Sequence, residues 1–241
     1  MTHSYYDPGS ERGAKVQALF DAIAPSYDLV NDLQSFGLHR YWKSRLVSLG
    51  QPSPGQSALD LCCGTGDLVF AWARREINTV GVDFSHAMLA VAARRLQAHR
   101  ALAPRVTFVC GDAQCLPFAD EQFDIVSVGY GLRNLAAWER GIDEMWRVAK
   151  PGGRLLILEF GRPPNLLWRS IYERYLRWVV PVFGRIFAGD RETYAYILES
   201  LQHYPAQPGV TAKLVGLAAV EIKLHNFLGG VMSVHSATKP K

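Results

Sequence analysis

Carboxylates recur where apolar, β-branched runs of this sequence end. Asp60 and Asp67 flank a glycine loop, Gly64-Thr65-Gly66. Asp83 closes the next apolar run, and Asp112 follows the run after that. Ligands of open α/β sheets bind at the carboxyl ends of the strands, where residues from successive strands meet. We therefore expect these acids to border one ligand site.

The glycine loop favours a cationic ligand over a phosphate. Its glycines let the backbone approach a ligand, and the helix that follows offers free N–H groups. The dinucleotide fingerprint requires a third glycine where this chain has Val69, and Asp67 would repel a pyrophosphate. Asp60 and Asp67 instead suit the ammonium and sulfonium of S-adenosylmethionine. The alternative is that Asp67 only caps the helix.

The next two acids fit the nucleoside part of such a ligand. Asp83 stands 17 residues after Gly66, where an acid accepts hydrogen bonds from both ribose hydroxyls. Asp112 can accept from an adenine amino group, and the backbone N–H of Ala113 can contact the ring. A ribose site without a pyrophosphate site favours a nucleoside cofactor.

Strand and helix patterns alternate along the chain and predict the elements that position these acids. Nearly continuous apolar runs indicate strands buried on both faces, hence a doubly wound α/β sheet that is mostly parallel and seven-stranded, similar to a Rossmann fold. The last two strands are too close in sequence for a crossover and must form an antiparallel hairpin. The expected strands are 58–62, 79–83, 106–110, 123–129, 154–160, 220–225 and 231–237, and the expected helices are 14–23, 32–49, 67–75, 85–99 and 138–149.

The pattern divides one domain of 241 residues into four parts. Residues 1–50 are expected to form a helical cover, and residues 51–161 the cofactor-binding core. Residues 162–215 are expected to form a helical insertion over the substrate, and residues 216–241 the last strands.

Composition excludes several classes of protein. A net charge of +4 is too small to indicate nucleic-acid binding, and no apolar run approaches the roughly 20 residues that span a bilayer. The polar N-terminus lacks a secretory signal, so we expect a cytoplasmic protein. The four cysteines have no zinc-site spacing and the histidines no metal spacing, so we predict free thiols and no metal.

Longer segments of the chain resemble the ubiquinone/menaquinone biosynthesis C-methyltransferases, a family of class I S-adenosylmethionine-dependent methyltransferases. The resemblance covers nearly the whole chain, and Gly131-Leu132-Arg133-Asn134 is its most specific part. It implies cofactor contacts at Thr65, Asp83, Asp112, Ala113 and Gly129, the last being a serine in many relatives, and the glycine loop adds Gly64 and Gly66 to the expected cofactor site. The segments that carry it are Val16–Asp32, Ser35–Lys43, Gly129–Asn134, Leu155–Phe160 and Tyr194–Ser200.

The resemblance also implies the reaction, in which a methyl group moves to a ring carbon of a prenylated demethylquinol. We expect demethylmenaquinol as substrate, the alternatives being a ubiquinone-pathway or phylloquinone-type quinol or another small molecule. Arg133 would hold the developing oxyanion, and Asn134 would orient a second hydroxyl or a water. Tyr27, Asp28 and His225 remain open as the base. A non-catalytic nucleoside-binding module is the alternative of a different class. The sequence leaves the assembly state open, a homodimer included.

One segment carries the whole net charge of the chain. Residues 162–186 hold five arginines and a single acid, Glu173, among many aromatic and apolar residues. Such a segment is either a cover over the active site or a contact with an anionic membrane surface, where a prenylated substrate resides. The second reading predicts a peripheral position on the inner face of the membrane.

Overall fold

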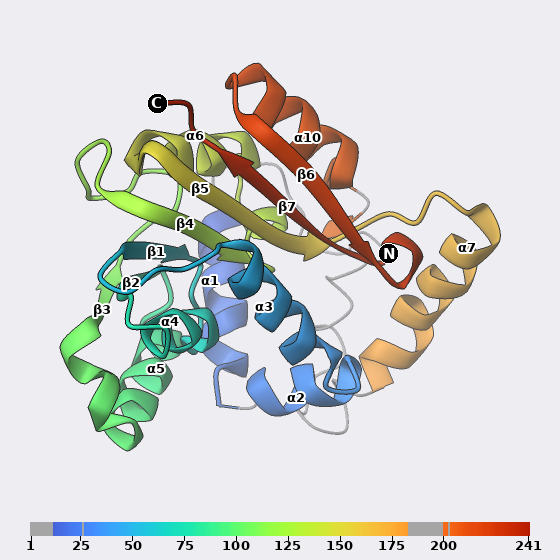
Figure 1. Ribbon diagram of the computed structural model, residues 1–241. Coiled ribbons are helices and arrows are strands. Elements are labelled where there is room, and N and C mark those ends of the chain that lie inside the picture. The colour runs from blue at the N-terminus through green and yellow to red at the C-terminus, as the bar shows by residue number, and fades with distance from the viewer. Residues whose placement is uncertain (1–11, 26, 183–199, 202) are drawn as a thin grey trace.

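The computed structural model describes residues 12–25, 27–182, 200–201 and 203–241. Seven strands form one sheet in the order β3-β2-β1-β4-β5-β7-β6, with helices on both sides (Figure 1). The strands are β1 (Ser57–Leu61), β2 (Asn78–Asp83), β3 (Val106–Cys110), β4 (Phe123–Gly129), β5 (Ala149–Phe160), β6 (Val220–Phe227) and β7 (Met232–Thr238). The helices are α1 (Arg12–Ile23), α2 (Tyr27–Gln34), α3 (Leu38–Leu49), α4 (Asp67–Ala73), α5 (His86–Ala98), α6 (Trp138–Val148), α7 (Leu166–Arg174) and α10 (Ala206–Gly216).

Strand pairing confirms the predicted sheet. The first five strands are parallel, with β1 between β2 and β4. β7 lies antiparallel between β5 and β6, so that Phe160 pairs with Met232. This order places the ends of β1, β2 and β4 side by side, and the segments that follow these strands therefore face one another.

Side chains on the two faces of the sheet form separate cores. Leu59 and Leu61 of β1 contribute to a core with Ile142 of α6 and Val210 of α10 on one face. Ala58, one position away, contributes to a second core beneath α3 and α4. Alternation along the strand sends successive side chains to opposite faces, and both faces here are covered.

The N-terminal cover has three helices where two were predicted, and α2 begins at Tyr27, before the expected start at residue 32. Residues 32–49 were expected to form a single helix, but α2 ends at Gln34 and α3 begins at Leu38. Phe36 and Gly37 adopt φ of 51° and 74°, in the left-handed region that a helix cannot continue through. The apolar spacing runs on across the break, which is why periodicity alone did not reveal it.

A second cover, which packs against α1 and α2 of the first, lies beside it. α7 is continued by a π-helical turn, η3 (Tyr175–Val179), and this run packs against the end of β5 and the β6–β7 connection (Figure 1). Of the segment 162–186, residues from 183 onward, Arg185 among them, lie outside the described residues. No helix within the described ranges is long and apolar enough to cross a membrane.

Candidate functional site

A polar cavity of about 290 Å³ opens at the carboxyl ends of the central strands. Residues after β1, β2, β3 and β4 line it, and α1 closes it from the N-terminal side. Of the predicted cofactor residues it contains Gly64, Asp83, Asp112, Ala113 and Gly129. The expected convergence of strand-end residues on one site is therefore present.

Asp83 is the fixed acid of this cavity. Its side chain is buried, and its two oxygens accept backbone hydrogen bonds from Gly64 (2.8 Å) and Ser85 (2.9 Å). Burial raises the pKa of this carboxyl, and the two backbone donors offset part of the effect. Each oxygen retains a lone pair that can accept from a ligand hydroxyl.

Asn134 and Asp112 add acceptors at other points of the cavity. Asp112 is exposed, and its Oδ1 accepts a hydrogen bond from the backbone N–H of Gln114 (2.8 Å). Asn134 donates its Nδ2 to the carbonyl of Tyr130, while its buried Oδ1 has no hydrogen-bond partner among the residues that the structure describes. The side-chain oxygen of Asn134 is therefore an acceptor that a ligand donor could satisfy.

Two of the predicted cofactor residues do not line this cavity. Thr65 is buried. Its hydroxyl donates a hydrogen bond to Oδ1 of Asp28 (2.7 Å) and accepts one from Nη1 of Arg95 (2.9 Å). Gly66 caps α4 with φ of 88°, a conformation suited to glycine. Within the glycine loop, the structure brings only Gly64 to the cavity wall.

The two acids that flank the loop are not available to a cationic ligand, contrary to the sequence-based interpretation. Asp60 is buried, accepts from Ser127 (2.7 Å), and burial raises its pKa to about 7. Asp67 pairs with Lys43 (2.7 Å) and Arg95 (2.6 Å). Burial alone would raise the pKa of Asp67, but these two cations hold it well below its usual value. Asp67 thus serves as an ion-pair centre for α3, α4 and α5, and the N-cap position of α4 is held by Gly66.

The charge of the polar cavity still fits a nucleoside with a cationic sulfur. Asp83 and Asp112 line it, and no Lys, Arg or His does so within the described part of the chain. Its unpaired acceptor on Asn134 can take an N–H from the ligand's ammonium. A phosphate would meet acids and no cation here, so the residues present fit S-adenosylmethionine and disfavour a dinucleotide. No cluster of metal-ligating side chains occurs among the residues described.

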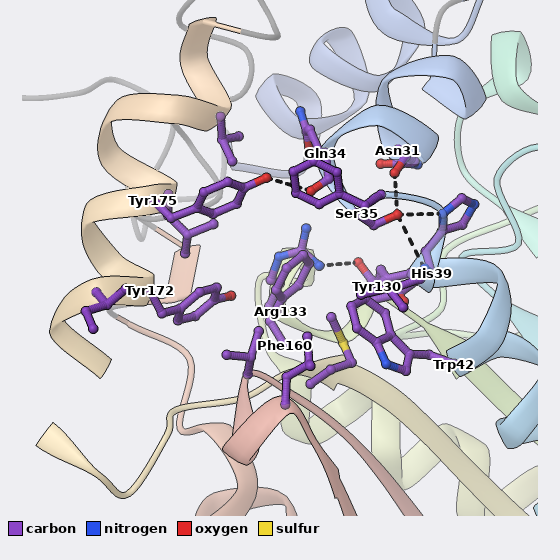
Figure 2. Close-up of a pocket in the computed structure, with 18 of the residues that line it drawn as sticks. Asn31, Gln34, Ser35, His39, Trp42, Tyr130, Arg133, Phe160, Tyr172 and Tyr175 are labelled. Atoms are coloured by element: carbon purple, nitrogen blue, oxygen red, sulfur yellow. Dashed lines mark hydrogen bonds between the residues drawn. The ribbon is translucent and has the colours of Figure 1, made fainter. Parts of the chain in front are cut away.

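A second, apolar cavity of about 320 Å³ lies beside the first. Figure 2 shows its aromatic walls, which come from the α2–α3 region, the segment after β4, the end of β5, and α7 with η3. Six residues of the segment 162–186 line this cavity, namely Trp168, Ile171, Tyr172, Tyr175, Leu176 and Val180.

Arg133 lines this apolar cavity as half of a buried ion pair. Its Nη1 lies 2.8 Å from Oε1 of Glu159, and the two side chains are 4% and 3% exposed. The same nitrogen donates to the carbonyl of Tyr130 (2.6 Å), and the guanidinium stacks over Phe160 at 4.7 Å. Glu159 therefore offsets the charge of Arg133, which the sequence could not reveal.

Arg133 and Asn134 line different cavities. Arg133 borders the apolar cavity and Asn134 the polar one. Adjacent positions in the short helical turn that follows β4 project in different directions, so the two side chains do not converge on one ligand as expected.

Tyr27 and Tyr130 line both cavities, so the two cavities meet at these residues. Tyr130 has φ of 63°, a costly conformation for a bulky residue and one that clusters at functional sites. Burial raises the pKa of Tyr27 to about 12, so its hydroxyl stays protonated near neutral pH. Of the three residues left open as a base, Tyr27 is in the site, while Asp28 and His225 line neither cavity.

Comparison with known proteins gives consistent matches. The model of the ubiE/COQ5 methyltransferase family matches residues 9–239. The chain is 37% identical to the ubiquinone/menaquinone biosynthesis C-methyltransferase UbiE of Azotobacter vinelandii, over 99% of this chain and 96% of that protein.

Solved structures share the fold at low sequence identity. The [4+2]-cyclase SpnF superposes with a TM-score of 0.65 at 19% identity, over 94% of this chain and 95% of that one. Phosphoethanolamine N-methyltransferase 2 of Haemonchus contortus, in complex with S-adenosyl-L-methionine, gives 0.60 at 18% identity, over 80% of this chain and 51% of that one. These two proteins support the fold alone.

Proposed function

The chain belongs to the ubiE/COQ5 methyltransferase family, and from that premise we propose that it methylates a ring carbon of demethylmenaquinol to give menaquinol. The observation that carries this proposal is the junction of two cavities of opposite character at Tyr27 and Tyr130. The polar one suits a nucleoside with a cationic sulfur, and the apolar one suits a ring with a hydrocarbon tail.

The methyl donor is S-adenosylmethionine, which supplies an electrophilic methyl group on a sulfonium when bound. Asp83 would accept hydrogen bonds from the ribose hydroxyls. Asp112 and the backbone of Ala113 would meet the adenine, and Asn134 Oδ1 would accept from the ammonium. Gly64 and Gly129 give the backbone room at the cavity wall.

The aromatic side chains that line the apolar cavity would pack against the acceptor ring and fix its orientation. Trp42, Tyr130, Phe160, Tyr172 and Tyr175 all line it. Offset or edge contacts between aromatic rings contribute about 0.5–1.5 kcal/mol each beyond burial. Much of the rate would come from this alignment of ring carbon and methyl group, for which effective molarities reach about 10⁵ M or more.

Arg133 would stabilise negative charge on an oxygen of the ring. A carbon nucleophile requires an electron-rich ring, hence a quinol with one hydroxyl at least partly ionised. A guanidinium stays protonated and can donate to that oxygen in a water-poor cavity. Glu159 fixes the position of Arg133. Asn134, on the cofactor side, would not take part in binding the ring.

The lining also bears on which quinol is used. A demethylmenaquinol has a fused two-ring system with few polar substituents, whereas ubiquinone-pathway rings carry additional oxygens. Few polar atoms face the apolar cavity and many aromatic rings do. This favours demethylmenaquinol, with the ubiquinone-pathway or phylloquinone-type quinol as the alternative acceptor.

The test is incubation of the protein with isotopically labelled S-adenosylmethionine and a panel of reduced demethylquinones, followed by mass analysis of the products. We expect label on the naphthoquinol ring carbon. Methylation of benzoquinols alone would assign the chain to the alternative acceptor, and methylation of none of them would refute the substrate.

We also propose that α7 and η3 rest on an anionic lipid surface, from which the prenyl tail enters. Leu166, Leu167 and Trp178 are exposed here, next to the exposed cations Arg174 and Arg177. Exposed apolar side chains beside arginines suit the boundary between acyl chains and anionic headgroups. Trp168 and Ile171 on the same helix are both exposed and part of the cavity lining, so this surface adjoins the cavity mouth.

Vesicle flotation tests the membrane contact. Vesicles with phosphatidylglycerol should retain the protein, and Arg174→Glu with Arg177→Glu should reduce retention. The matched control is Arg74→Glu with Arg75→Glu, an exposed pair at the end of α4 on the opposite side of the molecule (Figure 1). Equal retention of both double variants would refute a contact through α7.

A further inference from the structure

Three residues that line the apolar cavity each carry a buried polar atom with no hydrogen-bond partner among the described residues. The atoms are Nε2 of Gln34, Oη of Tyr130 and Oη of Tyr172. They come from α2, from the segment after β4 and from α7, which are far apart in the sequence. Figure 2 shows Tyr172 and Tyr130 on opposite sides of Arg133, with Gln34 across the cavity from them.

Two other polar groups of the same cavity are hydrogen-bonded within the protein. The hydroxyl of Tyr175 donates to the carbonyl of Gln34 (2.6 Å), and Ser35 Oγ lies 2.8 Å from Nδ1 of His39 (Figure 2). A buried polar group without a partner costs free energy, and phenylalanine would remove that cost at both tyrosines. The unsatisfied atoms are thus a specific feature of this wall.

We propose that the hydroxyls of Tyr130 and Tyr172 and the amide of Gln34 recognise the oxygen substituents of the acceptor ring. This assignment rests on the proposed function and extends it. It makes the three side chains positioning residues that orient the ring, while Arg133 stabilises the charge that develops on it.

The hydrogen-bonding capacity of the three groups fits a quinol. The amide nitrogen of Gln34 only donates, so it requires a lone pair on the ligand, whereas a tyrosine hydroxyl both donates and accepts. A quinol hydroxyl also does both. Burial raises the pKa of Tyr130 and of Tyr172, so both remain hydroxyls and keep their proton for donation.

The position of Tyr130 gives its hydroxyl a special role. Tyr130 also lines the polar cavity, so an oxygen bound to it lies next to the methyl donor's site. The ring carbon adjacent to that oxygen is the activated one, because an ionised hydroxyl raises electron density ortho to itself. Tyr130 would thus select which ring carbon meets the methyl group.

Binding of two related ring compounds tests the assignment without methyl transfer. The probes are menadiol, kept reduced with dithionite, and 2-methylnaphthalene, which has the same rings and no oxygens, each titrated into protein saturated with S-adenosylhomocysteine. The variants Tyr130→Phe, Tyr172→Phe and Gln34→Met should each raise the Kd of menadiol about threefold to tenfold, the value of one hydrogen bond. The Kd of 2-methylnaphthalene should change less than twofold.

Tyr204→Phe is the matched control. The hydroxyl of Tyr204 is also buried without a partner, but Tyr204 packs against Trp138 and lines neither cavity. Its removal should leave both affinities unchanged. All three Tyr→Phe variants should retain or increase thermal stability, because none loses a hydrogen bond within the protein. A structural role at Tyr130 or Tyr172 would instead lower Tm.

Four outcomes would overturn the assignment. One is a menadiol Kd within twofold of the wild-type value in every cavity variant. Another is an equal loss of affinity for both probes. The third is a wild-type protein that binds neither probe, which would also refute the acceptor cavity on which the proposed function depends. Normal methylation of the quinol panel by all three variants, with unchanged KM, would reject these positioning residues and leave the proposed function intact.

Discussion

Replacing Arg133 by methionine should both destabilise the protein and reduce methyl transfer, and the two effects can be separated. Methionine retains much of the side-chain length but leaves Glu159 buried without its counter-charge. Glu159 then keeps the backbone hydrogen bonds from residue 133 (3.2 Å) and Phe160 (2.9 Å). These two backbone N–H donors carry no net charge, so they do not compensate the buried charge of Glu159 as the guanidinium does.

The expected cost follows from the burial of the pair. With side chains 4% and 3% exposed and a separation of 2.8 Å, Arg133 and Glu159 form a fully buried ion pair. Removing one partner from such a pair costs about 3–5 kcal/mol of unfolding free energy, because the other charge is left uncompensated. The double variant Arg133→Met with Glu159→Gln removes both charges and should recover about 1–3 kcal/mol of the summed single costs.

Urea denaturation of the wild type, both single variants and the double variant measures this coupling. Activity provides the second readout: the double variant should remain at least about a hundredfold slower than wild type, the usual loss for one oxyanion donor. Its affinity for S-adenosylmethionine should be unchanged, since Arg133 lines only the apolar cavity. Additive costs within about 0.5 kcal/mol would refute the coupled pair. Full activity in the double variant would refute the role of Arg133 in the reaction.

Three further predictions concern the cofactor site, pH and packing. Asp83→Asn should weaken S-adenosylmethionine binding by about 1.5–3 kcal/mol in calorimetry, and unchanged affinity would remove Asp83 from the site. Burial lowers the pKa of His39 and of His235 to about 4, so the unfolded chain binds more protons than the native one between about pH 6.5 and 4. These two histidines should therefore lower the unfolding free energy as the pH drops through this range, while the raised pKa of Asp60 acts in the opposite direction. Wild type should lose stability relative to the double variant His39→Gln with His235→Gln as the pH falls from 6.5 to 4, and parallel urea profiles of the two proteins would contradict this. Gly131→Ala should destabilise by about 1–3 kcal/mol, because a Cβ there would lie 2.4 Å from Cβ of Cys62; an unaltered thermal midpoint would show that the loop shifts at no cost.

Most of the sheet was predictable because its strands are buried on both faces. Two predicted strands, 106–110 and 123–129, match β3 and β4 at both ends. The short spacing between the last two strands was sufficient to predict their antiparallel pairing. The break between α2 and α3 was missed, although Gly37 after Phe36 was a signal for a left-handed turn.

The site was predictable in its position but not in its electrostatics. Asp83 lies in the cavity because the end of a strand fixes it there. The pairing of Asp67 depends on Lys43 and Arg95, which are 24 and 28 residues away on other helices. No local pattern links these residues, so the sequence could not show that Asp67 was already neutralised.

The apolar cavity was the least predictable part. Its walls come from five separate segments, and its unsatisfied hydroxyls become visible only when every partner within reach is known. From the sequence, Tyr130 was one residue of a family segment, and Tyr172 was one aromatic residue in a basic helix. The structure brings both to the same cavity as Arg133.

The central claim is that an electron-rich ring in the apolar cavity receives the methyl group where the two cavities meet, beside Tyr27 and Tyr130. A single-turnover experiment with excess protein, S-adenosylmethionine and demethylmenaquinone, run once with the ring reduced and once with it oxidised, tests this most directly. The account predicts a C-methylated naphthoquinol from the reduced ring and no product from the oxidised ring. Equal product from both, or a methyl group found on oxygen, would contradict it.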